Sequence, residues 1–228
     1  MIRGMAVSLT RPRPRHAPPN NLPLKGCKKF MSGRYDIAPV GVGASPGIVL
    51  LTDADGGAKR RLLAQVTEIF FETSNTKMFE SAAAKDLFFK RWCGSYAKMA
   101  PDAFLLATDR GEAVGYVAGC VDSFSPAYQA IADGIFYYTP PARLALSSYP
   151  SHFHINIRPD YQGKGLGRLL TERFVNLCRD SGYPSVHVVT GASSAAEKFY
   201  KACCFKRLAP MAEFSNDLAV LTRSTLVP

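Results

Sequence analysis

Apolar residues recur along the chain in two different periods, and the period changes with position. Spacings of three and four residues predict helices over 59–73 and 81–98, and Pro101 ends the second. A short apolar run, Ile48–Thr52, predicts the first strand of the folded part, and the run 35–40 is a candidate for an earlier edge strand. Gly and Pro residues between 41 and 47 mark a linker.

A predicted hairpin and a long connection follow. Apolar runs over 103–108 and 113–121 flank the turn Asp109-Arg110-Gly111-Glu112. The next segment, 122–150, is too long for a simple connection between strands and carries the aromatic run Phe136-Tyr137-Tyr138. Such a segment is typical of a lid or a substrate wall, or of an oligomer contact, and the pattern leaves both open.

The most informative stretch runs from Ile155 to Arg168, where a β-branched strand leads through a glycine-rich turn into an amphipathic helix. Its glycines allow backbone conformations that a Cβ forbids and let a ligand approach the backbone. The first helical turn directs unpaired N–H groups at the glycine turn, and Lys164 and Arg168 add positive charge. These features predict a site for a pyrophosphate-bearing cofactor.

The spacing of this turn excludes two common nucleotide motifs. A P-loop requires Lys followed by Ser or Thr after its glycines, and neither pair is present. The Rossmann fingerprint requires G-x-G-x-x-G at the opening of a βαβ unit. Here Gly163, Gly165 and Gly167 are spaced G-x-G-x-G and lie late in the chain. A different family of cofactor sites is therefore indicated.

A second strand-to-helix segment lies between 186 and 205. Val186, Val188 and Val189 predict a short buried strand. Ser193 and Ser194 then open a helix, with Ser at the cap position and Glu in the first turns. The segment ends Tyr200-Lys201-Ala202-Cys203-Cys204-Phe205.

Residues Gln162, Gly165 and Gly167 match the pattern Q-x-x-G-x-G, and on this loop the chain resembles the GNAT superfamily of N-acetyltransferases. The second segment resembles the other half of the GNAT site, which commonly ends Y-x-x-x-G-F; here Cys204 replaces the Gly, which puts a left-handed helix cap in doubt. The resemblance covers roughly 48–226. It implies an α/β (α+β) fold with a central mixed, mostly antiparallel sheet, flanking helices and a V-shaped cofactor cleft between two parallel strands.

The same resemblance implies acetyl-CoA as co-substrate and assigns its contacts. The backbone of three strand residues would hold the pantetheine arm, together with Ser194 in place of a family Asn; these residues are Ile155, Asn156 and Ile157. The turn would bind the pyrophosphate through Gln162, Gly163, Lys164, Gly165, Leu166, Gly167 and Arg168. Tyr200 would lie near the sulfur of coenzyme A and return a proton to the thiolate.

Acetyl transfer also requires a neutral amine. A lysine-like amine has a pKa of about 10.4, so its neutral form at pH 7 costs about 4.6 kcal/mol. A neutral histidine is a suitable relay. Strand alternation puts His152, His154 and Asn156 on one face, and we take His154 as the candidate base, against the competing interpretation of a structural histidine. No third ligand has convincing spacing for a metal, so none is predicted.

The stretch from Tyr149 to Ile155 narrows the resemblance further. It is similar to a bacterial GNAT subgroup related to the acetyltransferase-like domain at the C-terminus of O-GlcNAcases. That subgroup commonly has Asp where this chain has Asn156, so a catalytic role of that carboxylate is not carried over.

Charge changes the picture only at the N-terminus. The 228 residues include 28 Lys and Arg and 18 Asp and Glu, a net charge of +10, but residues 1–30 hold seven of the basic residues and no acidic one. We therefore predict a disordered basic Pro/Arg-rich tail and linker over 1–46 and a GNAT domain over 47–228. We interpret the tail as a solvated leader; a targeting peptide, a nucleic-acid arm or a start at Met31 are the alternatives.

No secretory or membrane-spanning apolar run is present, and six cysteines without C-x-x-C spacing suggest reduced thiols. We therefore expect a cytoplasmic, acetyl-CoA-dependent N-acetyltransferase acting on a primary amine of a small molecule or peptide. No membrane or nucleic-acid partner is expected, and a homodimer is left open. An acyl-CoA-binding domain without turnover is the alternative, and a nucleic-acid binder that uses the basic tail is a third class.

Overall fold

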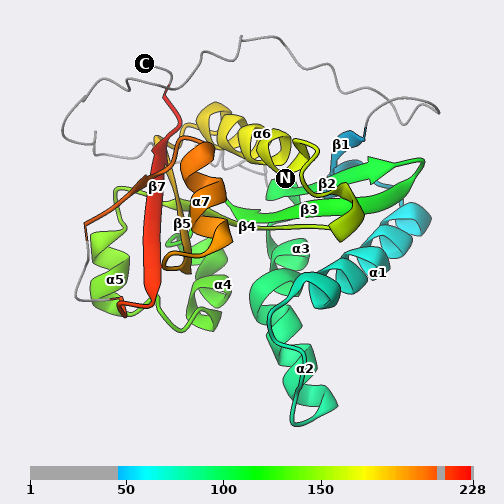
Figure 1. Cartoon of the computed structure of the whole chain (residues 1–228), viewed down its shortest axis with the longest axis horizontal. Coiled ribbons are helices and arrows are strands. Elements are labelled where there is room, and N and C mark those ends of the chain that lie inside the picture. The colour runs from blue at the N-terminus through cyan, green and yellow to red at the C-terminus, as the bar shows by residue number, and fades with distance from the viewer. Residues whose placement is uncertain (1–45, 210–213, 227–228) are drawn as a thin grey trace, which may run out of the picture.

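A seven-stranded sheet organises the part of the chain that the computed structural model describes, residues 46–209 and 214–226. The strands lie in the order β1-β2-β3-β4-β5-β7-β6 (Figure 1). Their bounds are β1 Gly47–Leu50, β2 Phe104–Asp109, β3 Glu112–Cys120, β4 Ser151–Ile157, β5 Ser185–Gly191, β6 Lys206–Arg207 and β7 Leu218–Ser224. Neighbouring strands are antiparallel except β4 and β5, which are parallel. The predicted mixed, mostly antiparallel sheet is confirmed.

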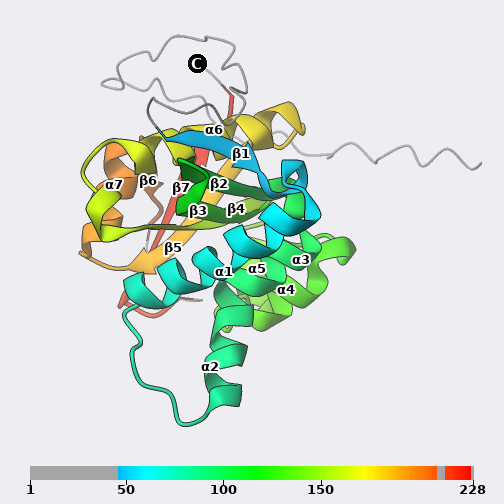
Figure 2. The same cartoon turned by 90° about the vertical axis from the view of Figure 1, so that its right-hand side faces the viewer.

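Helices cover both faces of this sheet (Figures 1 and 2). Helix α6 lies on one face, whereas α1 and α3 lie on the other, and α2 projects away from the sheet. The helices are α1 Gly56–Thr73, α2 Ala82–Phe89, α3 Ser95–Met99, α4 Gln129–Gly134, α5 Pro140–Ala145, α6 Leu166–Asp180 and α7 Ala195–Ala202. Short 3-10 turns span Leu51–Asp53, Pro101–Ala103, Pro126–Tyr128 and Pro159–Tyr161.

The two helices predicted before the hairpin are present, with differences at their ends and middle. Helix α1 begins three residues early, at Gly56, because the Asp55 side chain caps it by accepting from two backbone N–H groups. The helix expected over 81–98 is interrupted by a π-helical turn at Lys90–Gly94. Ring packing accompanies this turn, since a Cβ on Gly94 would lie 3.0 Å from the Phe89 ring. The turn changes the direction in which Trp92 and the following Tyr96 project.

The long segment after β3, 122–150, is folded and is not an irregular connection. It contains α4 and α5, and Tyr137 and Tyr138 are buried in the core while Phe136 is 66% exposed. An aromatic triplet that is followed closely by two prolines carries little periodicity, so its burial came from tertiary packing. Thr139 caps α5 by accepting from the Ala142 N–H.

Four cysteines, Cys93, Cys120, Cys178 and Cys203, are free and buried, as expected of reduced thiols, whereas Cys204 is disulfide-bonded, which corrects that expectation for its thiol. Burial raises the pKa of Cys93 to about 12, so this thiol is inert at neutral pH. Within the described residues, no helix has the length and apolar character to cross a membrane. The predicted tail over 1–46, apart from its last residue, and the candidate strand over 35–40 lie outside the described residues.

Candidate active site

Strands β4 and β5 part soon after they begin. Their parallel pairing joins Ser151 to Val186 and His152 to His187. Strand β4 then continues to Ile157 while it stays paired with β3 on its other side. Beyond Phe153 the edge of β4 that faces β5 therefore has no strand partner among the described residues. Unpaired backbone groups along such an edge can receive an extended ligand.

Only alternate residues of β4 present their backbone at this open edge. The N–H of Arg158 donates to the Val114 carbonyl of β3, so strand alternation directs the backbone of Asn156 toward β3 as well. Ile155 and Ile157 face the open side, and the Ile157 carbonyl accepts from Gln162 Nε2 at 2.8 Å. Of the three strand residues expected to hold the pantetheine arm, Ile155 keeps both backbone groups unpaired in the described part of the chain. The Asn156 backbone is therefore turned away from the open side, which does not favour the pantetheine contact predicted for it.

The Asn156 side chain also has partners within the protein. Its Nδ2 donates to Thr73 Oγ1 on α1, and its Oδ1 accepts from the Tyr116 hydroxyl at 3.1 Å. The expected alternation of faces on β4 is confirmed, because Phe153 packs on Phe174 of α6, on the side opposite His154 and Asn156. Asn156 thus ties β4 to α1 and β3.

The turn before α6 is open to a ligand. Gly163 and Gly165 have φ values of 72° and 85°, and a Cβ on either would meet nothing within 4 Å. Gly165 is the N-cap of α6, and no side chain caps this helix. The first intrahelical bond runs from the Leu169 N–H to the Gly165 carbonyl. The N–H groups of the first turn are thus available to an anion such as a pyrophosphate.

The other predicted residues of this turn differ in role. A Cβ on Gly167 would lie 3.1 Å from Ile157 and from the Phe199 ring, so this glycine lets α6 approach β4 and α7 closely. Leu166 is buried and can offer only its backbone. Gln162 links the turn to the end of β4 through its hydrogen bond to the Ile157 carbonyl. The charged groups Lys164 and Arg168 are exposed, where each can reach a phosphate.

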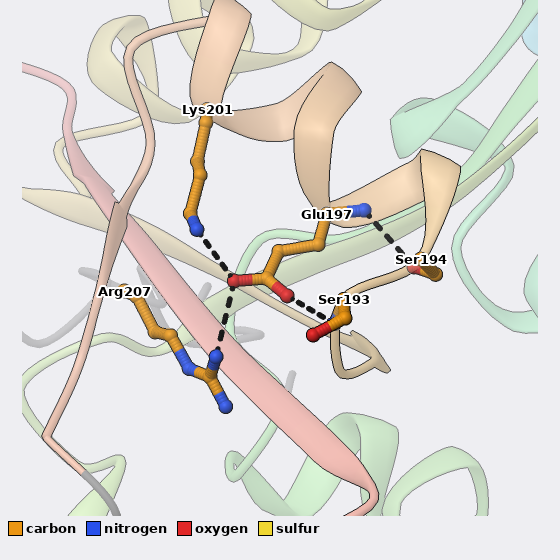
Figure 3. Close-up of polar contacts among 5 residues, drawn as sticks. All are labelled: Ser193, Ser194, Glu197, Lys201 and Arg207. Carbon is orange, nitrogen blue, oxygen red and sulfur yellow. Dashed lines mark hydrogen bonds and ion pairs between the residues drawn. The ribbon is translucent and has the colours of Figure 1, made fainter.

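The start of α7 is fixed by a variant of the capping box, in which Glu197 bonds the residue before the N-cap Ser194 (Figure 3). Ser194 Oγ accepts from the Glu197 N–H at 3.1 Å, and Glu197 Oε2 accepts from the Ser193 N–H at 2.6 Å. The Glu197 carboxylate is buried and also pairs with Lys201 at 2.8 Å and Arg207 at 3.3 Å. The hydrogen bond from Lys201, followed by that from Ser193, lowers the pKa of Glu197. Ser194 therefore has a capping role besides the ligand contact predicted for it.

The end of α7 keeps its left-handed cap without the family glycine. Cys204 adopts φ 66°, the Phe205 N–H donates to the Tyr200 carbonyl, and the Cys204 N–H donates to the Lys201 carbonyl. These two bonds form a Schellman motif, and the Phe205 and Tyr200 rings lie 5.6 Å apart. The doubt raised by Cys204 is thereby resolved at the cost of placing a side chain in the left-handed region.

Tyr200 itself is buried between α7 and β4. Its ring contacts Phe153 and Phe205. Its hydroxyl has no hydrogen bond to a described residue and is not fully buried, because Thr171 Oγ1 is the one fully buried side-chain polar atom without a partner in the described part. Burial raises the pKa of Tyr200. The phenol is therefore protonated at neutral pH, but it is a weaker acid than the ordinary value of about 10 suggested. It can donate a hydrogen bond to a developing thiolate more readily than it can transfer the proton completely.

On the opposite face of β4, His154 lies in an aromatic environment. Its ring packs edge-on against Trp92 at 5.2 Å and Tyr96 at 5.5 Å, and its Nε2 is 3.1 Å from the Tyr96 hydroxyl. Burial, followed by the neighbouring His187, lowers the pKa of His154 to about 4. The imidazole is therefore neutral at physiological pH and can accept a proton.

Several residues at this site were missed by the sequence interpretation. Tyr96 and Ser123 bond to the histidines of β4, and Tyr137 packs on Trp92. The nearby Tyr200 hydroxyl adds to the effect of burial in raising the pKa of Tyr137, so the two phenols are near one another. The aromatic run that includes Tyr137 was the one available signal. The sequence pattern indicates only an apolar helical position for Tyr96, because its hydrogen-bond partner His152 lies 56 residues away in the sequence.

The sequence profile of the Acetyltransferase (GNAT) family matches residues 61–205. No curated protein sequence matches the chain significantly. The chain is similar in fold to the protein SsHAT, at 21% identity and a TM-score of 0.61, covering 81% of this chain and 100% of that one.

Two further solved structures are informative. A GNAT superfamily phosphinothricin acetyltransferase from Sinorhizobium meliloti, in complex with acetyl-CoA, has 19% identity and a TM-score of 0.51, covering 79% of this chain and 89% of that one. A polyamine N-acetyltransferase from Drosophila melanogaster has 15% identity and a TM-score of 0.53, covering 79% of this chain and 100% of that one. Identities this low show the fold alone. The family match spans more than half of the sequence, and the chain therefore belongs to the GNAT acetyltransferase family.

Proposed function

We propose that this acyltransferase moves an acetyl group from acetyl-CoA to a primary amine of a small molecule or peptide. The observation that carries the proposal is the presence of two open surfaces on one strand-turn-helix segment: the unpaired edge of β4 at Ile155 and the uncapped N-terminus of α6 behind Gly163 and Gly165. The first suits an extended amide-containing arm and the second a pyrophosphate. Acetyl-CoA joins these two chemical parts in one molecule.

Two side chains on opposite faces of β4 support the proton transfers that this reaction needs. When bound, acetyl-CoA supplies an activated acyl group, and its transfer forms an amide and releases a thiol. His154 is neutral and can take the proton that the amine loses. Tyr200 keeps its proton at neutral pH and can donate a hydrogen bond where the thiolate develops. We propose these two residues as the catalytic pair.

A thiol-release assay tests turnover. Acetyl-CoA is incubated with a panel of primary amines, and free coenzyme A is measured with a chromogenic thiol reagent. For an accepted amine, His154→Gln should lower kcat by about 10² or more while the KM for acetyl-CoA is unchanged. Binding of acetyl-CoA without thiol release from any amine would favour the alternative, an acyl-CoA-binding domain without turnover.

A second experiment tests the cofactor site independently of turnover. Arg168→Glu reverses an exposed charge beside the α6 N-terminus and should weaken coenzyme A binding roughly tenfold or more. Arg60→Glu makes the same charge change on an exposed position of α1 and serves as the control. Calorimetry that finds equal affinities for the two variants would contradict the proposed pyrophosphate site. Charge reversal is preferable to a bulky residue at Gly165, because that backbone has φ 85° and a side chain would strain it without any ligand.

Three narrower expectations remain predictions. One is the relationship to the O-GlcNAcase-associated bacterial subgroup, which rests on the stretch from Tyr149 to Ile155. The others are a cytoplasmic location and a homodimer. The amine panel bears on the acceptor class, and sedimentation of the purified chain would measure its oligomeric state.

A further inference from the structure

A chain of buried hydrogen bonds runs from β4 through α3 and back to the segment after β3. His154 Nε2 lies 3.1 Å from the Tyr96 hydroxyl, which lies 2.6 Å from His152 Nε2. His152 Nδ1 in turn lies 2.6 Å from Ser123 Oγ, and Ser123 Oγ lies 2.5 Å from the Pro150 carbonyl. Tyr96, Ser123 and His152 are at most 2% exposed. Water therefore does not compete for these bonds.

The direction of every bond follows from the last one. A carbonyl oxygen can only accept, so Ser123 donates its proton to Pro150 and must accept from His152 Nδ1. His152 is then protonated at Nδ1, and its Nε2 accepts the Tyr96 hydroxyl proton. The Tyr96 oxygen must accept from the next group, so His154 carries its proton on Nε2. A single carbonyl thus fixes the tautomers of two histidines.

This assignment requires both imidazoles to be neutral, and their surroundings ensure it. Burial lowers the pKa of His152 well below its usual value, with His187 and His154 adding to the effect. Burial also lowers the pKa of His154 to about 4. At neutral pH each ring therefore has one donor and one acceptor nitrogen.

The series of hydrogen bonds begins at His154, whose other ring nitrogen, Nδ1, is free in the described part of the chain. No hydrogen bond to a described residue involves this atom, and Thr171 Oγ1 is the one fully buried side-chain polar atom without a partner in the described part. His154 Nδ1 is therefore not fully buried. Because the proton is held on Nε2, the lone pair of His154 Nδ1 is available on the face of β4 that Trp92 borders.

We infer that Ser123, His152 and Tyr96 are positioning residues that hold His154 in the Nε2–H tautomer, so that Nδ1 is the atom that accepts the proton of the amine. The catalytic use of that atom rests on the proposed acetyl transfer. This series of hydrogen bonds does not conduct protons to solvent, because the Pro150 carbonyl at its end cannot take up a proton. Its effect is to keep one imidazole lone pair always directed at the site.

Nuclear magnetic resonance measures the tautomers directly. Two-bond ¹⁵N–¹H correlations of the imidazoles distinguish Nδ1–H from Nε2–H, and the spectrum of His154→Gln assigns its signals among the four histidines of the chain. We expect His152 as Nδ1–H and His154 as Nε2–H in the wild type. Ser123→Ala removes the hydroxyl that accepts from His152 Nδ1 without touching His154, and should convert part of the His154 population to Nδ1–H. The kcat should fall with the Nε2–H population while the KM for acetyl-CoA is unchanged.

Two variants make the experiment specific. Ser185→Ala removes another buried serine hydroxyl that donates to a carbonyl, that of Ser148, and should leave His154 unchanged. Tyr138→Phe removes the hydroxyl that bonds to His187 Nε2 and that also contacts Ser123. It should alter the His187 signals, while His154 keeps its Nε2–H tautomer because its partner Tyr96 and the Ser123 bond to Pro150 are unchanged. His187 Nδ1 bonds to the Tyr149 carbonyl, so its Nδ1–H signal also reports that each variant is folded.

A wild-type His154 protonated at Nδ1 would overturn the inference. So would a His154 spectrum in Ser123→Ala that is the same as in Ser185→Ala. If the tautomers respond as expected but no amine yields thiol release from the wild type, the proposed function fails and the catalytic use of Nδ1 fails with it. The two failures are therefore distinguishable.

Discussion

Gly119 on β3 offers the sharpest test of how α6 docks on the sheet. A Cβ at this position would lie 2.0 Å from Phe174 Cε2 and 2.6 Å from Phe174 Cζ. Phe174 is fully buried on α6, and its ring lies 5.0 Å from that of Phe153. Gly119→Ala therefore forces the Phe174 ring, and with it α6, away from β3. Helix α6, which follows the open glycine turn, would then lose its close packing on β3.

The size of the effect follows from two opposing terms. Overpacking in a core costs about 1–3 kcal/mol, and a 2.0 Å contact belongs at the upper end of that range. Replacing Gly by Ala within a strand returns roughly 0.5–1 kcal/mol through lower backbone entropy in the unfolded chain. We expect a net loss of about 2 kcal/mol. For a chain of this size that corresponds to a Tm lower by about 4–8 °C.

Thermal unfolding followed by circular dichroism measures this loss. Gly134→Ala is the control, because a Cβ there meets nothing within 4 Å and the Tm should not fall. Gly119→Ala combined with Phe174→Leu should be more stable than the sum of the two single changes, since the smaller side chain removes the clashing atoms. A Gly119→Ala protein with the wild-type Tm, or strictly additive single changes, would refute the packing argument.

Three further predictions concern the cap of α7, its buried carboxylate and the N-terminal tail. Cys204→Gly should be more stable than Cys204→Ala by about 1–2 kcal/mol in urea unfolding, because both lose the sulfur and only Ala keeps a Cβ at φ 66°; equal stabilities would contradict a strained cap. The lowered pKa of Glu197 means that its ion pairs stabilise the fold above the ordinary carboxyl pKa of about 4.3 and stop doing so as pH falls through the folded value. Glu197→Gln should therefore lower the Tm at pH 7 and lose its effect in acid, whereas a deficit independent of pH would rule out the charge as its cause. A chain that begins at Met31 should keep the Tm and the coenzyme A affinity of the full chain, because a Pro/Arg-rich segment buries little apolar surface; an earlier Tm or a lost ligand would show that the tail contributes to the domain.

The parts of this protein that the sequence predicts well are those whose contacts are close in sequence. The turn from Ile155 to Arg168 and the cap at Ser194 depend on backbone geometry and on hydrogen bonds spanning a few residues. Glycine spacing and helical periodicity report such contacts directly. The sheet class and the family followed from these two segments, because each combines a strand with the helix that it enters.

Tertiary structure alone decided which atoms of those segments are available for chemistry. Nothing local to β4 reveals that the Asn156 backbone bonds to β3, that Gly167 is a packing residue, or that the 122–150 segment folds into the core. The same holds for the tautomer of His154, which depends on a hydroxyl 58 residues away in the chain and, through it, on the Pro150 carbonyl. A hydrogen-bond chain is directional and closes only when all its members meet, so no single position in the sequence carries its signal.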